Sequence, residues 1–304
     1  MSTAEFEAMD AERCIALLPV GATEQHGPHL PVSVDADINA GILSRALELL
    51  PNDVPLTCLP PVSYGKSVEH DDFSGTVSLS TNTLIAMWTD IGEAVARAGV
   101  KKLIIFNSHG GQPQVMEIVA RDLRKRFGML VVTVSWFGFG LPEGIFEEDE
   151  LKHGLHAGDV ETSIMLHLHP DLVNMERQGK ERPVVPCERL AASPQRLCWR
   201  AHASRRYTQS VTPNDSFTSL RRPTAFNHPS HRTHSADNFV STGRDMEDTF
   251  KYLTPEGGGV GFGWLAQDLN PSGATGDATL ATAEKGQLCV VGSSSPLNVT
   301  AMDG

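Results

Sequence analysis

The sequence has little of several features that mark particular classes of protein. Its five cysteines are scattered over 304 residues without a C-x-x-C pair, so neither a disulfide scaffold nor a thiolate zinc site is indicated. Lysine and arginine number 25 against 37 acidic residues, which leaves a formal net charge of −12. This balance argues against nucleic acid and anionic membrane surfaces as partners, because both attract clustered basic side chains.

Long apolar runs are missing as well. Eighteen or more consecutive apolar residues, as a membrane helix requires, occur nowhere, and the acidic N-terminus has no apolar segment typical of a signal peptide. The hydrophobic content of 40% and charged content of 20% are those of a globular protein. We therefore expect a soluble protein of the reducing cytoplasm, with no membrane partner.

The sequence does contain a dense group of metal-binding residue types directly after its first apolar run. Residues 21–35 include Glu24, His26, His29 and Asp35, which offer the carboxylate and imidazole groups that divalent cations bind. Glu24 and His26 are two residues apart, so in extended chain they point the same way. Such clusters mark metal or catalytic sites, and the segment predicts one.

Apolar runs alternate with segments of helical period along the first half of the chain. Strands are predicted at 14–20, 54–62, 102–106 and 130–136, and helices at 38–50, 81–98 and 114–127. This order predicts an α/β fold, a three-layer α/β/α sandwich with a mostly parallel central sheet. Ligands bind at the carboxyl ends of such strands, which is where Glu24, His26 and His109 fall.

Two further histidines lie in turns rich in small residues. His109 stands in an Asn-Ser-His-Gly-Gly turn, where the glycines allow an ion or substrate to approach the backbone; an ordinary hydrogen-bonded loop histidine is the alternative. His156 precedes Asp159, a candidate N-cap of a helix, and Glu161 falls in the first turn of that helix. For Glu161 a solvated charge favoured by the helix dipole is the alternative.

Several of these segments resemble, in order, the successive blocks of the creatininase family of amidohydrolases. They are residues 24–31 with Asp35, 64–79, 107–111, 156–163 and 276–286. The resemblance implies one domain over residues 1–304, a homo-oligomer that is often a hexamer, and a centre of one or two divalent ions, zinc, manganese or iron. It also implies that Glu24, Asp35 and His109 hold one ion, and that His26 and Asp35 hold the other.

The chain departs from creatininase at one position. Creatininase is expected to carry a carboxylate ligand of the second ion two residues beyond the histidine that matches His109, and this sequence has Gly111. Glu161 is the candidate to fill that place, as a metal ligand or as a catalytic base. Creatinine is therefore not the expected substrate. Other members of the family remove a formyl group in pyrimidine biosynthesis or trim a peptide precursor of a redox cofactor.

The expected function is a metal-dependent amidohydrolase that cleaves the C–N bond of a small cyclic amide, lactam or formamide. A bound divalent ion, zinc first, lowers the pKa of its water to about 7, and His156 is the candidate to protonate the leaving nitrogen. A peptidase that trims a precursor peptide and a non-catalytic, metal-stabilised oligomer are the alternatives.

The stretch at about 187–253 is dense in polar residues and proline and shows little periodicity. We interpret it as an insertion, either a lid or a loop at a subunit contact, because long loops in compact domains tend to be functional or disordered. The histidines of 228–234 have proline among them and no helical signal, which favours a polar loop over a further metal site.

Overall fold

A computed structural model describes residues 2–178, 180–181, 253–254, 260–261 and 264–294. Four parallel strands form its central sheet in the order β2-β1-β3-β4. They are β1 (Ile15–Val20), β2 (Leu56–Cys58), β3 (Lys102–Asn107) and β4 (Leu130–Ser135). β1 and β3 are almost completely buried, which is why both consist of continuous apolar runs.

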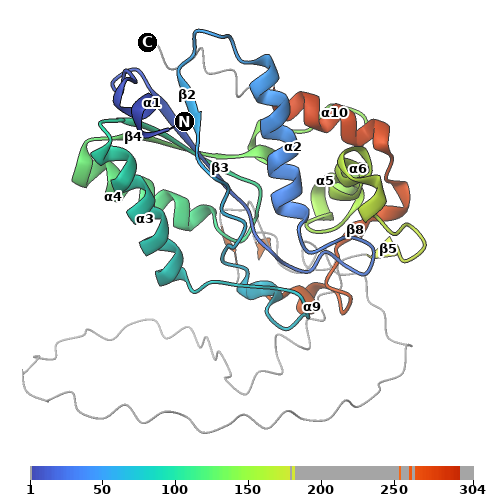
Figure 1. Cartoon of the computed structure of the whole chain (residues 1–304). Coiled ribbons are helices and arrows are strands. Elements are labelled where there is room, and N and C mark those ends of the chain that lie inside the picture. The colour runs from blue at the N-terminus through green and yellow to red at the C-terminus, as the bar shows by residue number, and fades with distance from the viewer. Residues whose placement is uncertain (1, 179, 182–252, 255–259, 262–263, 295–304) are drawn as a thin grey trace, which may run out of the picture.

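Helices cover both faces of this sheet (Figure 1). The longer ones are α2 (Val34–Leu49), α3 (Thr81–Arg97), α4 (Pro113–Phe127), α6 (Asp159–Leu168) and α10 (Ala283–Ser294). Successive side chains of β1 point to opposite faces: Ile15 and Leu17 pack with α2, α6 and α10, whereas Ala16 and Leu18 pack with α3 and α4. The predicted three-layer α/β/α sandwich with a parallel sheet is thereby confirmed.

Short elements complete the described chain. They are α1 (Thr3–Glu7), η1 (Val68–His70), η2 (Trp136–Phe139), α5 (Glu148–His153), η3 (Pro170–Leu172), β5 (Lys180–Glu181), β6 (Leu253–Thr254), β7 (Val260–Gly261), α9 (Ala266–Leu269), β8 (Gly276–Asp277) and η4 (Ala278–Leu280). Within the described ranges, every helix is too short or too polar to cross a membrane. The insertion predicted at about 187–253 lies outside the described residues except for its last residue, and the 228–234 histidines lie wholly outside them.

The structure corrects three local predictions. Helix α2 begins at Val34, four residues before the predicted start, so Asp35 lies in its first turn. The predicted strand 54–62 shortens to β2, because two prolines follow it and only Val62 returns to pair with β1. Asp159 is the first residue of α6 and does not cap it; the N-cap is Gly158.

The carboxyl ends of β1 and β3 lie side by side, with Val20 paired to Asn107. The loops that leave these two ends carry Glu24 and His26 on one side and His109 on the other. Parallel strands therefore bring together, at one edge of the sheet, residues that lie more than eighty positions apart in the chain.

Candidate metal centre

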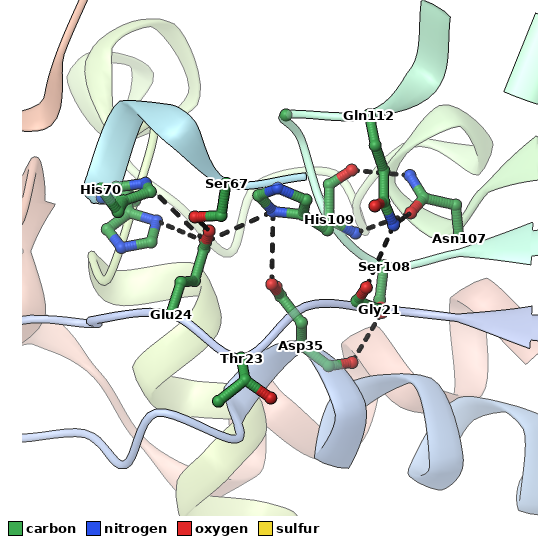
Figure 2. Close-up of polar contacts among 12 residues, drawn as sticks. Gly21, Thr23, Glu24, Asp35, Ser67, His70, Asn107, Ser108, His109 and Gln112 are labelled. Atoms are coloured by element: carbon green, nitrogen blue, oxygen red, sulfur yellow. Dashed lines mark hydrogen bonds and ion pairs between the residues drawn. The ribbon is translucent and has the colours of Figure 1, made fainter. Parts of the chain in front are cut away.

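Glu24, Asp35 and His109 meet at the carboxyl edge of the sheet (Figure 2). Nδ1 of His109 lies 3.3 Å from Glu24 Oε1 and 3.3 Å from Asp35 Oδ2. Each of the three side chains is at most 2% exposed. Two carboxylates and an imidazole thus share a buried space with the donor types that a divalent ion requires.

A second group of possible ligands adjoins the first. It consists of His26, His156 and Glu161, and a third grouping joins Glu24, His70 and His156. His26 Nε2 lies 3.7 Å from Asp35 Oδ1 and 3.8 Å from Glu161 Oε2. The predicted residues of the site therefore converge from three separate segments of the chain, 24–35, 107–111 and 156–163.

The partners of two imidazoles leave one nitrogen of each ring free for a ligand. Nε2 of His109 donates to the backbone oxygen of Lys66 at 2.8 Å, and Nε2 of His156 donates to that of Gln25 at 2.6 Å. Because a carbonyl oxygen only accepts, the neutral form of each ring has its lone pair on Nδ1. Both Nδ1 atoms face Glu24 Oε1, at 3.3 and 3.7 Å. A backbone carbonyl that fixes the tautomer in this way is typical of metal-binding histidines.

His26 carries the observation that fits an ion best. Its Nδ1 donates to the backbone oxygen of Glu24, so Nε2 has the lone pair, and among the described residues this buried atom has no hydrogen-bond partner. Carboxylate oxygens of Glu24, Asp35 and Glu161 surround it at 3.7–4.0 Å. Ligand atoms that share an ion lie roughly 3–4 Å apart, since each bond is about 2 Å long. The residues therefore fit a divalent ion.

Burial and mutual proximity shift the ionisation of the cluster. Burial raises the pKa of Asp35 well above its usual range, and the charge of Glu24 raises it further. Burial would also raise the pKa of Glu24, but His109 beside it holds that pKa well below the usual value. Burial would lower the pKa of His109, but Glu24 and Asp35 hold it well above the usual value. Without an ion, the group retains protons that a cation would replace.

His70 and Gln25 were missed as parts of the site. Gln25 Nε2 donates to the backbone oxygen of Gly273 at 2.8 Å and to His70 Nδ1 at 2.7 Å, so the proton of His70 lies on Nε2, which faces Glu24 Oε1 at 3.8 Å. Burial lowers the pKa of His70 to about 2. The N–H of His70 therefore faces Glu24, unlike the ring nitrogens of His26, His109 and His156 that face the carboxylates without a hydrogen-bonded proton. The pattern Glu-His at 69–70 was visible in the sequence, but no spacing rule connects it to Glu24.

Polar contacts hold the His109 loop in place. Asn107 Nδ2 donates to the backbone oxygen of His109 at 2.7 Å, and Gln112 Nε2 donates to Asn107 Oδ1 at 2.9 Å (Figure 2). On the other side of the cluster, the Ser67 hydroxyl donates to Glu24 Oε2 and the Ser108 hydroxyl to the backbone oxygen of Asp35. These side chains fix the orientation of the possible ligands.

His29, the fourth candidate of the 21–35 segment, lies apart from the cluster. It is buried, and its Nε2 makes a 2.9 Å hydrogen bond with the Thr162 hydroxyl. It belongs to none of the ligand groups found in the described part of the chain. The sequence pattern therefore indicated one histidine more than the site contains.

A cavity of about 210 Å³ opens beside the cluster. Its polar wall is formed by Glu24, Glu69, His70, His109, His156 and Glu161. Its apolar wall is formed by Trp136, Phe137, Leu141, Leu151, Leu155, Val160 and Trp264. Trp136 is buried in the hydrophobic core and also borders the cavity, whereas Phe137 is 43% exposed. A substrate in this cavity would contact both the ligand cluster and hydrocarbon side chains.

The family model described as creatinine amidohydrolase matches residues 1–292. The chain belongs to the creatininase family. Its fold agrees: a mutant creatininase of zinc–zinc type superposes with a TM-score of 0.62 at 22% identity over 98% of this chain and 93% of that one. A manganese creatininase gives 0.61 at 21% identity over 98% and 94%. The structural relatives thus include zinc and manganese forms, and this family member has groups of side chains that could bind such an ion.

Curated relatives in the creatininase family differ in what their names describe. A mycofactocin precursor peptide peptidase of Mycolicibacterium smegmatis is 33% identical over 159 residues, 52% of this chain and 59% of the relative. A creatinine amidohydrolase of Pseudomonas putida is 34% identical over 194 residues, 57% of this chain and 72% of the relative. The chain thus spans about three fifths of the length of the peptidase that it matches.

Proposed function

We propose that the protein hydrolyses a C–N amide bond with a water molecule activated by a divalent ion. The observation that carries this proposal is the convergence of three imidazoles, each with one ring nitrogen fixed by a backbone carbonyl, and three carboxylates in adjoining ligand groups beside an open cavity. A bound ion would supply a hydroxide at neutral pH and polarise the carbonyl of the substrate. Glu24, Asp35 and His109 would hold one ion, and His26, Asp35 and Glu161 a second.

His156 is the residue we assign to proton transfer. It borders the cavity, and its Nδ1 points toward the cluster while Nε2 is engaged by Gln25. Burial, followed by the charge of His26, lowers the pKa of His156, so the ring is neutral at pH 7 and can accept a proton at Nδ1. Passing that proton to the leaving nitrogen would allow the tetrahedral intermediate to collapse.

Glu161 has two roles open to it in this reaction. Its Oε2 accepts a hydrogen bond from the backbone nitrogen of Ala157 at 2.6 Å and lies 3.8 Å from His26 Nε2. Burial raises the pKa of Glu161 above that of an exposed glutamate. A carboxylate so placed can bind the second ion or take the proton of the attacking water.

A peptide with an apolar residue beside the scissile bond is the substrate class we favour. The cavity has one hydrocarbon wall, with Trp264 and Phe137 among its residues, and such a wall binds apolar side chains. The similarity to the precursor peptide peptidase supports the same class.

A small cyclic amide, lactam or formamide is the second candidate. It is favoured by the longer match to the creatinine amidohydrolase. For creatinine itself, the absence of a carboxylate at Gly111 argues against an identical site.

The test is a hydrolysis assay with protein loaded with zinc or manganese. The panel contains short peptides with leucine, valine, tyrosine or glutamate next to the terminal amide, together with creatinine, a lactam and a formamide. We expect release of an amine from peptides with an apolar residue, and much slower release from those with glutamate. Protein stripped with a chelator should be inactive and should recover on addition of the ion. Binding of ions without hydrolysis of any amide would instead support the metal-stabilised, non-catalytic alternative.

A further inference from the structure

Glu150 of α5 is a buried carboxylate to which the sequence pattern gave no role. It is 5% exposed and borders the cavity. Its Oε1 accepts a hydrogen bond from the backbone nitrogen of Asp159 at 2.7 Å, and its Oε2 accepts one from that of Asp277 at 2.9 Å. One carboxylate therefore ties the first residue of α6 to strand β8, about 120 positions further along the chain.

Three glycines provide the space for this carboxylate. A Cβ added to Gly154 would lie 2.4 Å from the nearest atom of Glu150. For Gly158 the distance would be 2.1 Å, and for Gly276 it would be 2.9 Å. Gly158 is also the N-cap of α6 and has no side chain that could accept a hydrogen bond from the first turn. Glu150 performs that function from a different helix, so the cap is at the same time a tertiary link.

The link lies beside the residues of the metal centre. His156 and Thr275 exchange two backbone hydrogen bonds, of 3.2 and 2.7 Å, and Glu150 joins the same two segments a few residues beyond this pair. Between the pair and α6, Ala157 has a φ of 55°, a left-handed conformation that alanine keeps only where its surroundings impose it. The nitrogen of Ala157 in turn donates to Glu161. The positions of His156 and Glu161 thus depend on how α6 is joined to β8.

We propose that Glu150 is a positioning residue for the side of the metal centre formed by His156 and Glu161. The other side of the centre is formed by Glu24, Asp35 and His109. Hydrogen bonds from Ser67, Ser108 and Asn107 hold it, and it does not depend on Glu150. The proposal rests on the proposed function only in requiring that the centre binds ions. In this proposal, Glu150 contacts neither the ion nor the reacting atoms. It acts through the segments that carry His156 and Glu161.

Glu150→Gln is the first test, with the exposed neighbour Glu148→Gln as the matched control. Glutamine offers one carbonyl oxygen, and its NH₂ group cannot accept the second backbone hydrogen bond. In a zinc titration, we expect one ion to bind about 10–100-fold more weakly, as for other residues that orient ligands, while the other keeps its affinity. The weakened ion should be the one that Glu161→Gln weakens, and the cobalt-substituted variant should show a changed absorption spectrum. Unchanged binding of both ions, or equal weakening of both, would overturn the proposal.

A second pair of variants separates positioning from simple capping and covers the case in which Glu150→Gln does not fold. In Glu150→Ala, the closest clash with a Cβ on Gly158 is removed and only Gly276 Cα, at 3.0 Å, remains near it, so adding Gly158→Ser supplies a local cap. We expect the double variant to regain thermal stability over Glu150→Ala while the ion remains weakly bound, because the link to β8 is still missing. Recovery of ion affinity together with stability would show that Glu150 is a helix cap only.

The same measurements keep the two proposals apart. A parent protein that binds ions and responds to Glu150→Gln, yet hydrolyses no amide, supports the role of Glu150 and contradicts the proposed function. A parent protein that binds no ion contradicts both.

Discussion

The carboxylate of Glu69 fills the space beside the backbone of Gly111. A Cβ built on Gly111 would lie 1.7 Å from Glu69 Oε1 and 2.6 Å from His109 Nε2. Lys66 holds this arrangement, since its Nζ donates to Glu69 Oε2 at 3.3 Å and to the backbone oxygen of Gly111 at 3.2 Å. The position where the creatininase resemblance led us to expect a carboxylate is therefore a glycine beside a carboxylate from another segment.

Gly111→Ala should accordingly lower the free energy of unfolding by about 1–3 kcal/mol, the usual cost of overpacking, and weaken binding of the ion at His109. Urea denaturation and a zinc titration measure the two effects. In Glu69→Ala/Gly111→Ala the closest clash is removed and only His109 Nε2, at 2.6 Å, still crowds the new Cβ, so the second substitution should cost less than it does alone. Equal costs in both backgrounds would contradict the steric explanation.

Asp35 and His26 should be required for full ion content. Asp35 Oδ2 lies 3.3 Å from His109 and its Oδ1 lies 3.7 Å from His26, and the buried Nε2 of His26 has no hydrogen-bond partner among the described residues. We expect elemental analysis to find one to two ions per chain in the parent protein and fewer in Asp35→Ala and His26→Ala, with Asp35→Ala the more severe. Asp37→Asn, in the same first turn of α2, is the control and should retain all ions. Parent-like ion content in both variants would remove the site as described.

His156→Ala should retain its ions and lose turnover by about 10²–10⁴, the usual contribution of a general acid–base group. Ion content and hydrolysis rate are measured on the same preparation, and His153→Ala serves as the control histidine. Loss of an ion would make His156 a ligand, which the direction of its Nδ1 toward Glu24 allows. A full hydrolysis rate would make it structural.

Glu161→Gln should weaken one ion selectively. The amide keeps the size of the side chain and an acceptor for the Ala157 nitrogen but removes the negative charge that faces His26. We expect the titration to show two unequal affinities, with the ion of Glu24, Asp35 and His109 unchanged. A variant that binds both ions normally but is inactive would identify Glu161 as the base for the attacking water instead.

His29 should make the ion-free protein sensitive to acid. Burial, followed by the charge of His156, lowers the pKa of His29 to about 4, whereas an unfolded histidine titrates near 6.5. Below about pH 6.5 the unfolded chain gains a proton that the folded protein does not, so stability is complete above that pH and falls as the pH approaches 4. Urea midpoints of His29→Gln should therefore fall less between pH 7 and pH 4.5 than those of the parent. Parallel curves would contradict this assignment.

Local sequence patterns predicted the layers of the fold well, because a parallel strand that is buried on both faces needs an apolar residue at nearly every position. The apolar run at 102–106 became β3 with one residue added, and the helix predicted at 81–98 became α3 with one residue fewer. Helix starts were less predictable. The start of α6 depends on Glu150, nine positions earlier and in another helix, so no pattern around Asp159 could identify the group that caps it.

The candidate site was predictable where chemistry and chain proximity coincide. Glu24, His26 and Asp35 stand in one segment, and His109 follows a strand end, so their convergence was expected. Gln25 and His70 were not, because their roles come from contacts that the fold creates between distant segments. The role of the three glycines around Glu150 could not be predicted either, since a glycine in the sequence does not indicate which group occupies the space beside it.

The hydrogen bond from Gln25 to Gly273 joins residues 248 positions apart. Gln25 also holds His70 and His156, so two histidines beside the cluster depend on a contact with a segment that the ribosome makes much later. During synthesis, the full set of contacts around these two histidines can therefore form only after residues 273–277 have emerged. The complete centre therefore assembles late in folding, after the segments that carry most of its possible ligands have been made.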